Sequence, residues 1–420
     1  MVYIAPMSRA PRVVSLFSGA GGMDYGFEAA GYRTAVAIEM DAACCATLER
    51  NKSHRAMQVV HRSIFDVPSS EVLALASARP REIDVVIGGP PCQPFSKSGL
   101  WARGDTPRLN DARAQTLAGY MRIVEDTLPR AVVLENVSGL AFDGKSEGLA
   151  FLRERFREIN RKHGTHYQPV WQVLSAASYG VPQLRERFFL IAAREPAGFT
   201  FPEPTHAEDG GDPATGRRVE PYRTAWDALW DVVPEPHEDL SMRGKWADLL
   251  PSIPEGKNYL HHTERGQGER LFGWRRRYWS FLLKLAKDRP SWTIQAQPGP
   301  ATGPFHWDNR LLSHRELCRL QTFPDRVEIT GNRGAIQRQV GNAVPSLLAE
   351  VIAREVGAQL LGVRSMRGQP VLLRPSAGKP PAPRRAAPVP AKYRSLIGRH
   401  EDHPGTGKGN RAQMWQAVGT

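Results

Sequence analysis

Short β-rich runs alternate with helical periodicity through the first half of the chain. The β-rich runs predict six strands, at residues 13–17, 34–38, 58–61, 83–87, 131–134 and 188–192. Apolar residues recur at helical spacing over 117–124 and 151–159. This alternation is typical of βαβ units and predicts an α/β fold with a doubly wound, mostly parallel sheet. In such sheets, ligands bind at the carboxyl ends of the strands.

The strand and helix alternation stops near Arg194, where Pro, Gly and Trp become frequent. We therefore interpret residues 11–193 as one domain and 194–336 as an inserted, smaller second domain. A short turn at 341–345 and an amphipathic helix over 347–356 return the chain to the first domain, within 337–363. Residues 364–420 are Pro-rich and basic without periodicity, which predicts a mobile tail.

Several classes of protein are excluded by composition. The longest apolar runs fall far short of the roughly 20 residues that cross a bilayer, so we expect no membrane span. The first residues lack the pattern of a secretory signal, and the four cysteines show no paired spacing. We expect a reducing, cytoplasmic location and no metal site.

Positive charge is concentrated in two segments. The net charge is +13, and residues 364–420 hold eleven Lys or Arg against Glu401 and Asp402. A second basic cluster, over 264–289, is interleaved with aromatic residues. Basic residues mixed with aromatics favour contact with phosphates and bases, although a solvated amphipathic helix is the alternative.

A glycine-rich segment follows the first predicted strand. It reads Ser18-Gly19-Ala20-Gly21-Gly22 and precedes a helix, where glycine lets backbone approach a ligand. Glu39 stands twenty residues after Gly19, at the tip of the next strand, where a carboxylate can bind ribose hydroxyls. The pattern predicts a nucleoside cofactor. The glycine spacing departs from the dinucleotide fingerprint, which disfavours a nicotinamide dehydrogenase.

Three further segments carry candidate chemistry. Cys92 follows two glycines and two prolines after strand 83–87, which puts a nucleophilic thiol on a loop at the ligand edge. Glu135 ends strand 131–134, where it either caps the next helix or, if desolvated, holds a proton on a substrate ring nitrogen. Arg185 and Arg187 are two residues apart before strand 188–192, so we expect both on one face, with surface salt bridges as the alternative.

Six segments together resemble the cytosine-C5 DNA methyltransferase family, of the bacterial modification methylase type. They occur in the family's order, at 15–22, 89–96, 135–137, 183–187, 315–325 and 339–345. The resemblance covers about residues 13–361. It implies a Rossmann-like fold, S-adenosylmethionine as the methyl donor, double-stranded DNA as the substrate, and a flipped cytosine.

The resemblance also implies a role for each matching residue. Cys92 matches the nucleophile that adds to C6 of cytosine, Glu135 the carboxyl that engages N3, and Arg187, with Arg185, the basic residues near O2. The implied cofactor residues are Phe17, Gly19, Gly22, Glu39, Met40, Ser63, Ile64, Asp66, Pro91, Leu117, Asn342 and Val344. The family usually has Asp-Ile where this chain has Ser63-Ile64, so either Ser63 or Asp66 contacts the adenine.

The segment Gly266-Gln267-Gly268-Glu269-Arg270 resembles a recognition-loop stretch of some bacterial members, in which the Gln inserts beside the orphaned guanine. An ordinary solvated loop is the alternative. The arginines near this segment are candidates for guanine or phosphate contacts: Arg270, Arg275, Arg276 and Arg277.

Two other functions remain open. An RNA cytosine-C5 methyltransferase acting on transfer RNA would share the scaffold, and a non-catalytic relative is disfavoured because Cys92, Glu135 and Arg187 are all present. The resemblance suggests a restriction-modification role as a monomer, with a cognate endonuclease that shares the DNA site without stable binding. The DNA site itself is not inferable.

Overall fold

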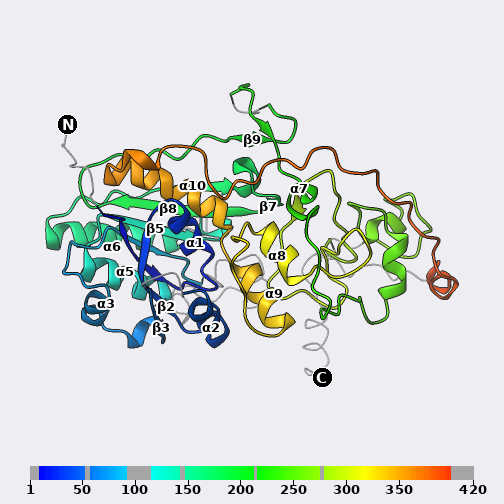
Figure 1. Ribbon diagram of the computed structural model, residues 1–420, viewed down its shortest axis with the longest axis horizontal. Helices are drawn as coiled ribbons and strands as arrows, with labels where there is room; N and C mark the ends of the chain where they lie inside the picture. The colour runs from blue at the N-terminus through cyan, green and yellow to red at the C-terminus, as the bar shows by residue number, and fades with distance from the viewer. Residues whose placement is uncertain are drawn as a thin grey trace, which may run out of the picture. The chain divides into compact units, whose positions relative to one another are not determined.

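The computed structural model describes residues 9–52, 57–91, 115–141, 147–211, 215–274 and 279–398. The chain forms two compact units (Figure 1). Unit 1 comprises Met1–Glu238, Asp288–Gln297 and Ser313–Lys379, and unit 2 comprises Asp239–Lys287, Pro298–Leu312 and Pro380–Thr420. These boundaries differ from the predicted insertion at 194–336, because much of that range packs with the first unit.

Unit 1 is built on a seven-stranded sheet in the order β3-β2-β1-β4-β5-β8-β6. Five strands are parallel neighbours: β1 (Arg12–Leu16), β2 (Arg33–Glu39), β3 (Gln58–His61), β4 (Val85–Gly88) and β5 (Ala131–Asn136). β8 (Glu186–Ala193) is antiparallel to both β5 and β6 (Val170–Ser175). All six predicted strands are confirmed. β6 was missed because it is an edge strand whose Trp171 and Gln172 are exposed, which breaks the apolar pattern.

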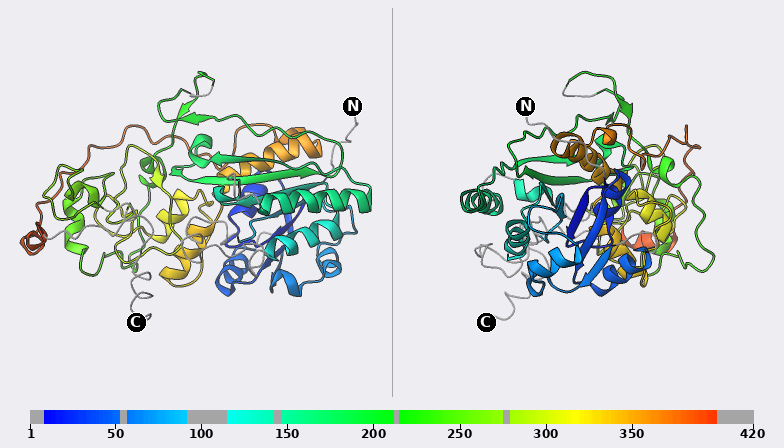
Figure 2. Two further views of the ribbon diagram at one scale, coloured as in Figure 1. Left: turned by 180° about the vertical axis from the view of Figure 1, so that it is seen from behind. Right: turned by 60° about the vertical axis from the view of Figure 1, so that its left-hand side comes forward.

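Helices cover both faces of this sheet (Figures 1 and 2). Val13 packs in the core with α1 (Gly22–Ala29) and α10 (Ser346–Val356), so the expected return of the last helix onto the sheet is confirmed. Val14 points to the other face, against α3 (Ser69–Leu75), α5 (Gln115–Thr127) and α6 (Glu147–His163). α2 (Ala42–Arg50) follows β2. Alternate residues of the strands thus build two separate cores.

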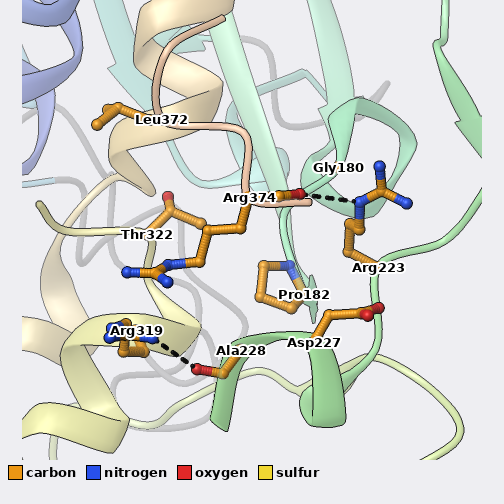
Figure 3. Close-up of a pocket in the computed structure, with 9 residues that line it drawn as sticks. All are labelled: Gly180, Pro182, Arg223, Asp227, Ala228, Arg319, Thr322, Leu372 and Arg374. Carbon is orange, nitrogen blue, oxygen red and sulfur yellow. Dashed lines mark hydrogen bonds between the residues drawn. The ribbon is translucent and has the colours of Figure 1, made fainter. Parts of the chain in front are cut away.

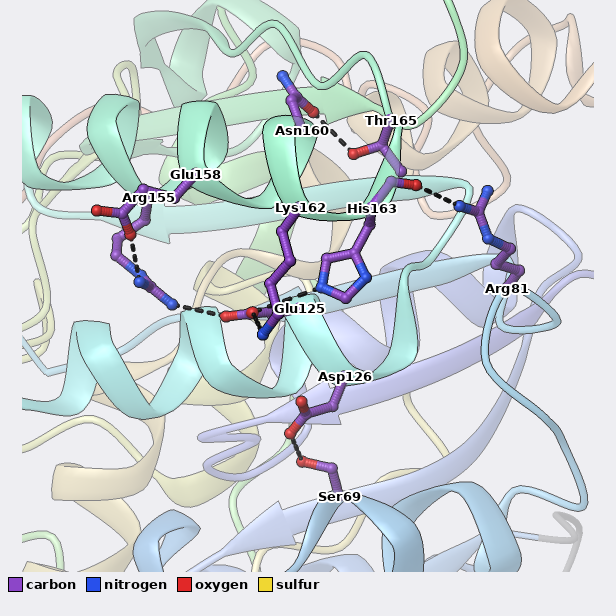
Figure 4. Close-up of polar contacts among 10 residues, drawn as sticks. All are labelled: Ser69, Arg81, Glu125, Asp126, Arg155, Glu158, Asn160, Lys162, His163 and Thr165. Carbon is purple, nitrogen blue, oxygen red and sulfur yellow. Dashed lines mark hydrogen bonds and ion pairs between the residues drawn. The ribbon is translucent and has the colours of Figure 1, made fainter.

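Outside the sheet, α5 and α6 are joined by one carboxylate (Figure 4). Glu125 accepts hydrogen bonds from Lys162 Nζ and Arg155 Nη2, both at 2.7 Å, and lies 3.5 Å from His163 Nε2. The hydrogen bond from Lys162 is the main cause that lowers the pKa of Glu125. The donors come from α6 and the acceptor from α5, so this cluster joins the two helices.

Among the described residues, no helix is both long enough and apolar enough to span a bilayer.

The rest of unit 1 consists of short elements. β7 (Gln183–Leu184) pairs with β11 (Ser291–Trp292), and β9 (His206–Ala207) with β10 (Glu220–Pro221). The helices are α7 (Ala225–Leu229), α8 (His314–Leu320) and α9 (Arg333–Asn342). Tight 3₁₀ turns lie at Ile64–Asp66, Ser138–Ala141, Ala176–Tyr179 and Arg364–Met366, and a short π-helical turn lies at Gly357–Leu361. The predicted turn at 341–345 is therefore the end of α9 followed by a linker.

Residues 367–379 lie along unit 1 rather than extending as a mobile tail. Arg374 and Leu372 line a small pocket in which Arg374 reaches toward Arg319 and Thr322 (Figure 3). Arg374 O accepts a hydrogen bond from Arg223 Nε at 3.2 Å. The prediction of a mobile tail is thus wrong for the described part, 364–398. Its Pro-rich composition misled because proline limits regular structure without preventing packing.

Unit 2 has little regular structure beyond short turns at Ala247–Ser252, Tyr259–His262 and Ala391–Leu396. Side chains hold it together instead. Its buried cluster is Leu249, Leu250, Ile253, Leu271, Leu282, Phe305, Val389 and Tyr393. Two of these eight residues come from the C-terminal segment, which is therefore a structural part of the unit.

Candidate functional site

The loop between β1 and α1 is fixed by a strand-end carboxylate. Gly19 N donates to Glu39 Oε2 at 2.8 Å, while Glu39 Oε1 accepts from the backbone N–H groups of Met40 and Asp41, also at 2.8 Å. Each carboxylate oxygen can accept two hydrogen bonds, so Oε2 retains capacity for a ligand hydroxyl. A Cβ added at Gly19 would meet nothing within 4 Å, so the backbone here faces open space. This is a cradle that fits a ribose.

The linker after α9 touches the first turn of α1. A Cβ added at Gly22 would lie 2.5 Å from Val344 O, so only glycine permits this approach. Gln321 Nε2 donates to Val340 O in the last turn of α9 at 2.6 Å and to Ala343 O in the linker at 3.2 Å. Asn342, at the end of α9, is exposed. The tertiary structure therefore brings Ala343 and Val344 to Gly22, across more than 300 residues of sequence, and Asn342 directly precedes this contact.

The remaining predicted cofactor residues divide by burial. Met40 is 67% exposed, Phe17 is half-buried, and Pro91 is exposed at the end of the described part of its loop. Ile64 and Leu117 are buried in the core, below the carboxyl ends of the strands, and are not exposed to a ligand.

Two residues after β3 were predicted as alternatives for the adenine contact. Ser63 Oγ accepts from Phe65 N at 3.4 Å and caps the turn that contains Asp66, whose side chain is exposed. Both stand at the same strand end, so the choice between them stays a prediction. Phe65, which the sequence analysis did not single out, lies next to Asp66 and is 51% exposed.

A buried ion pair lies at the carboxyl end of β5. The β5–β8 register places Glu135 opposite Phe189, so Arg187 is its diagonal neighbour on the same face. Arg187 Nε is 2.8 Å from Glu135 Oε1, and the two side chains are 13% and 11% exposed. Burial raises the pKa of Glu135, and the charges of Arg187 and Arg185 oppose that rise. A carboxyl with a raised pKa can hold a proton for a substrate.

The loop that leads to Cys92 is anchored against this pair. Asn136 Nδ2 donates to Pro90 O at 3.0 Å. A Cβ added at Gly89 would lie 2.7 Å from Glu135 Oε2, so glycine lets the backbone pass beside the carboxyl. Cys92 itself, with Arg275, Arg276 and Arg277, lies outside the described residues.

Arg185 differs from the expectation that both guanidinium groups face one site. Its Nη2 donates to Gly341 O at 2.7 Å and to Ala343 O at 3.1 Å, and its Nη1 to Ile294 O at 3.3 Å. Strand alternation fails here because Arg185 lies between β7 and β8. These contacts hold the Arg185 side chain against the end of α9 and the linker after it, and its catalytic role stays a prediction.

A further positioning contact was missed by sequence reasoning. Arg338 Nη2 on α9 lies 2.8 Å from Asp41 Oδ2, and Asp41 caps α2 through the backbone N–H groups of Ala43 and Cys44. The pair joins α9 to the end of β2. An acid before a helix signals a cap, but its cationic partner, 297 residues away, leaves no sequence signal.

In unit 2, the predicted recognition loop is tightly built. Gly268 N donates to His261 O at 2.8 Å, and a Cβ added at Gly268 would lie 2.6 Å from His262 Nδ1. Gln267 and Arg270 are both exposed. Close packing at Gly268 therefore fixes the backbone of the loop, while the Gln267 side chain is exposed to solvent.

A glycine loop, a strand-end acid and a buried Glu–Arg pair, gathered at the carboxyl edge of a mostly parallel sheet, define a Rossmann-like enzyme with a nucleoside cofactor. Residues 11–358 match the profile of the C-5 cytosine-specific DNA methylase family, and the chain belongs to that family. It is a DNA cytosine-C5 methyltransferase, and its methyl donor is S-adenosylmethionine.

Curated relatives agree with this assignment. The chain is 39% identical to the Type II methyltransferase M.SacI of Streptomyces achromogenes, over 85% of this chain and 95% of that protein. It is 32% identical to the Type II methyltransferase M1.HphI of Haemophilus parahaemolyticus, over 82% and 86%.

Solved structures share the fold. A putative DNA modification methyltransferase encoded within an E. coli prophage superposes with a TM-score of 0.56 at 22% identity, covering 84% of this chain and all of that one. Spodoptera frugiperda DNMT2 gives a TM-score of 0.55 at 14% identity, covering 83% and 99%.

Proposed function

We propose that Cys92 is the nucleophile of a covalent mechanism on a flipped cytosine. Its thiolate bonds to C6, and the electron pair displaced from the C5–C6 double bond makes C5 nucleophilic. Bound beside this site, S-adenosylmethionine supplies an electrophilic methyl group on its sulfonium. After C5 takes the methyl, a solvent water accepts the C5 proton, and the electron pair of that C–H bond re-forms the C5–C6 double bond and expels the Cys92 thiolate.

Glu135 and Arg187 stabilise the charge that develops on the ring. With its pKa raised by burial, Glu135 can donate a proton to N3 as C6 is attacked. Arg187, 2.8 Å from Glu135, orients the carboxyl and offers its guanidinium to O2. The buried Glu135–Arg187 pair, beside the backbone of Gly89, is the observation that carries this proposal.

The cofactor is held by the cradle at the ends of β1 and β2. Glu39 Oε2 accepts a ribose hydroxyl, and the backbone at Gly19, which faces open space, lies along the ligand, with Gly22 at the start of α1 beside it. Met40 and Phe65, both more than half exposed, flank the adenine.

Unit 2 is the target-recognition domain in this proposal. Its exposed Gln267 fills the space left by the flipped base, while Arg270, with Arg275, Arg276 and Arg277, contacts guanine or phosphate. The Type II relatives support a restriction-modification role, with a separate endonuclease that cuts the same unmethylated site. We further infer a monomer that acts on chromosomal DNA in the cytoplasm.

A trapping experiment tests the mechanism. Bisulfite sequencing of plasmid DNA from expressing cells first identifies the methylated site. A duplex with 5-fluorocytosine at that position then cannot release its C5 substituent, so the enzyme and DNA stay covalently joined. We expect mass spectrometry to find the adduct on Cys92, and none with Cys92→Ala. An adduct elsewhere, or turnover by Cys92→Ala, refutes the mechanism.

Substrate class is tested in parallel. We expect methyl transfer to duplex DNA and none to transfer RNA under the same conditions. Transfer RNA as the preferred acceptor would overturn the assignment of unit 2 to duplex recognition.

A further inference from the structure

Residues 380–398, here called the C-terminal strap, are fastened to unit 2 at several separate points. Tyr393 stacks on Trp246 with ring centroids 5.8 Å apart, and its hydroxyl donates to Lys245 O at 2.6 Å. Ala387 N donates to Pro251 O at 2.9 Å, and Arg384 Nη1 lies 2.9 Å from Asp308 Oδ1. The strap therefore has a defined path across the unit.

One contact of the strap reaches the recognition loop. Arg394 Nε lies 3.0 Å from Glu269 Oε2, and Arg394 Nη2 lies 3.0 Å from Glu269 Oε1. A two-point contact between a guanidinium and a carboxylate fixes orientation as well as distance. Glu269 stands between Gln267 and Arg270, the two exposed residues assigned to DNA contact.

The loop is held from its other side by the core of unit 2. Glu269 O lies 3.0 Å from His262 Nδ1, whose Nε2 is 2.8 Å from Ser252 Oγ. Leu271, two residues on, is 1% exposed in the core cluster. The backbone of Glu269 is thus fixed by the core, and its side chain by the strap.

We propose that Arg394 is a positioning residue for target recognition: through Glu269 it holds the loop in the form that presents Gln267 to DNA. The proposal rests on the proposed function of that loop. Without Arg394, the free loop is less ordered, and the conformational entropy that it loses on binding DNA weakens the binding. We expect weaker DNA binding and an unchanged rate of the chemical step.

The strap supplies a matched control. Lys392 pairs with Asp248, and this pair is at least as exposed as Arg394–Glu269, but Asp248 lies outside the loop. We expect Arg394→Ala to raise the KM for duplex DNA about three- to tenfold, with kcat within about twofold of the parent. We expect Lys392→Ala to leave both unchanged. Equal effects of the two substitutions would show a general loss of strap packing and overturn the proposal.

A double-mutant cycle separates positioning from direct contact with phosphate. If Arg394 acts through Glu269, Arg394→Ala has no further effect on KM in the Glu269→Ala background. Additive effects, with a smaller salt dependence after loss of Arg394, would mean that Arg394 binds phosphate itself and would refute the proposal.

Gln267→Ala separates failure of this proposal from failure of the proposed function. We expect it to raise the KM for DNA. An unchanged KM in that variant removes the recognition role of the loop, whereas a raised KM with Arg394→Ala at the parent value removes only the role of Arg394.

Discussion

Removal of Arg187 should destabilise the protein in a pH-dependent way. Arg187→Leu leaves the Glu135 carboxyl, 11% exposed, without the cation that now lies 2.8 Å away. A buried charge that loses its partner costs about 3–5 kcal/mol. Protonation of Glu135 avoids that cost, but holding a glutamic acid protonated at pH 7 itself costs about 4 kcal/mol relative to the unfolded chain.

The sign of this effect follows from the proton balance. Loss of Arg187 raises the pKa of Glu135 further, because Arg187 is the main group that now opposes the effect of burial. The folded variant then holds a proton that its unfolded form has released, so its stability falls as pH rises. The deficit relative to the parent should be small near pH 5 and grow by up to about 1.4 kcal/mol per pH unit toward pH 8.

Urea unfolding at pH 5 and pH 8, monitored by tryptophan fluorescence, measures this deficit. The double variant Arg187→Leu with Glu135→Gln is the control, because glutamine does not titrate and its deficit should be independent of pH. A deficit in Arg187→Leu that is equal at both pH values would refute the view of Glu135 as a buried acid held by Arg187.

Five other substitutions, at four positions, test the packing and burial of single residues. Gly22→Ala puts a Cβ 2.5 Å from Val344 O, which should cost about 1–3 kcal/mol and raise the KM for S-adenosylmethionine, whereas Gly198→Ala, with open space around its Cβ, should change neither thermal unfolding nor that KM. Burial lowers the pKa of His206 to about 4, so the folded protein keeps the ring neutral where the unfolded chain protonates it. The stability of the parent should therefore fall by up to about 3 kcal/mol as the pH drops from 6.5 to 4, and His206→Gln should not show this fall in acid unfolding. Tyr393→Ala should cost about 3–5 kcal/mol and Tyr393→Phe about 1 kcal/mol in urea unfolding, whereas a mobile tail predicts no change in either.

The central sheet could be predicted from the sequence because its strands are buried on both faces. Val85, Val86 and Ile87 are fully buried, and such continuous apolar runs are visible without any tertiary information. Edge strand β6 escaped prediction because one side of it meets solvent and its side chains need not be apolar.

The division into units could not be predicted from composition. Unit 2 takes three separate stretches of chain, and its core draws Val389 and Tyr393 from a Pro-rich segment that shows no periodicity. Periodicity reports regular elements, whereas this unit is held by contacts between irregular segments far apart in sequence.

The sequence by itself showed which residue types the site contains. Methyl transfer to cytosine needs a thiol, a carboxyl, guanidinium groups and a glycine loop, and each of these stands next to a strand that can be predicted from its apolar run. Tertiary structure decided what each does. Arg185 and Arg187 are two residues apart, yet one binds backbone carbonyls at the end of α9 and in the linker after it, and the other binds Glu135. Side-chain partners depend on which distant segments the fold brings within about 3 Å, and this information is absent from local sequence.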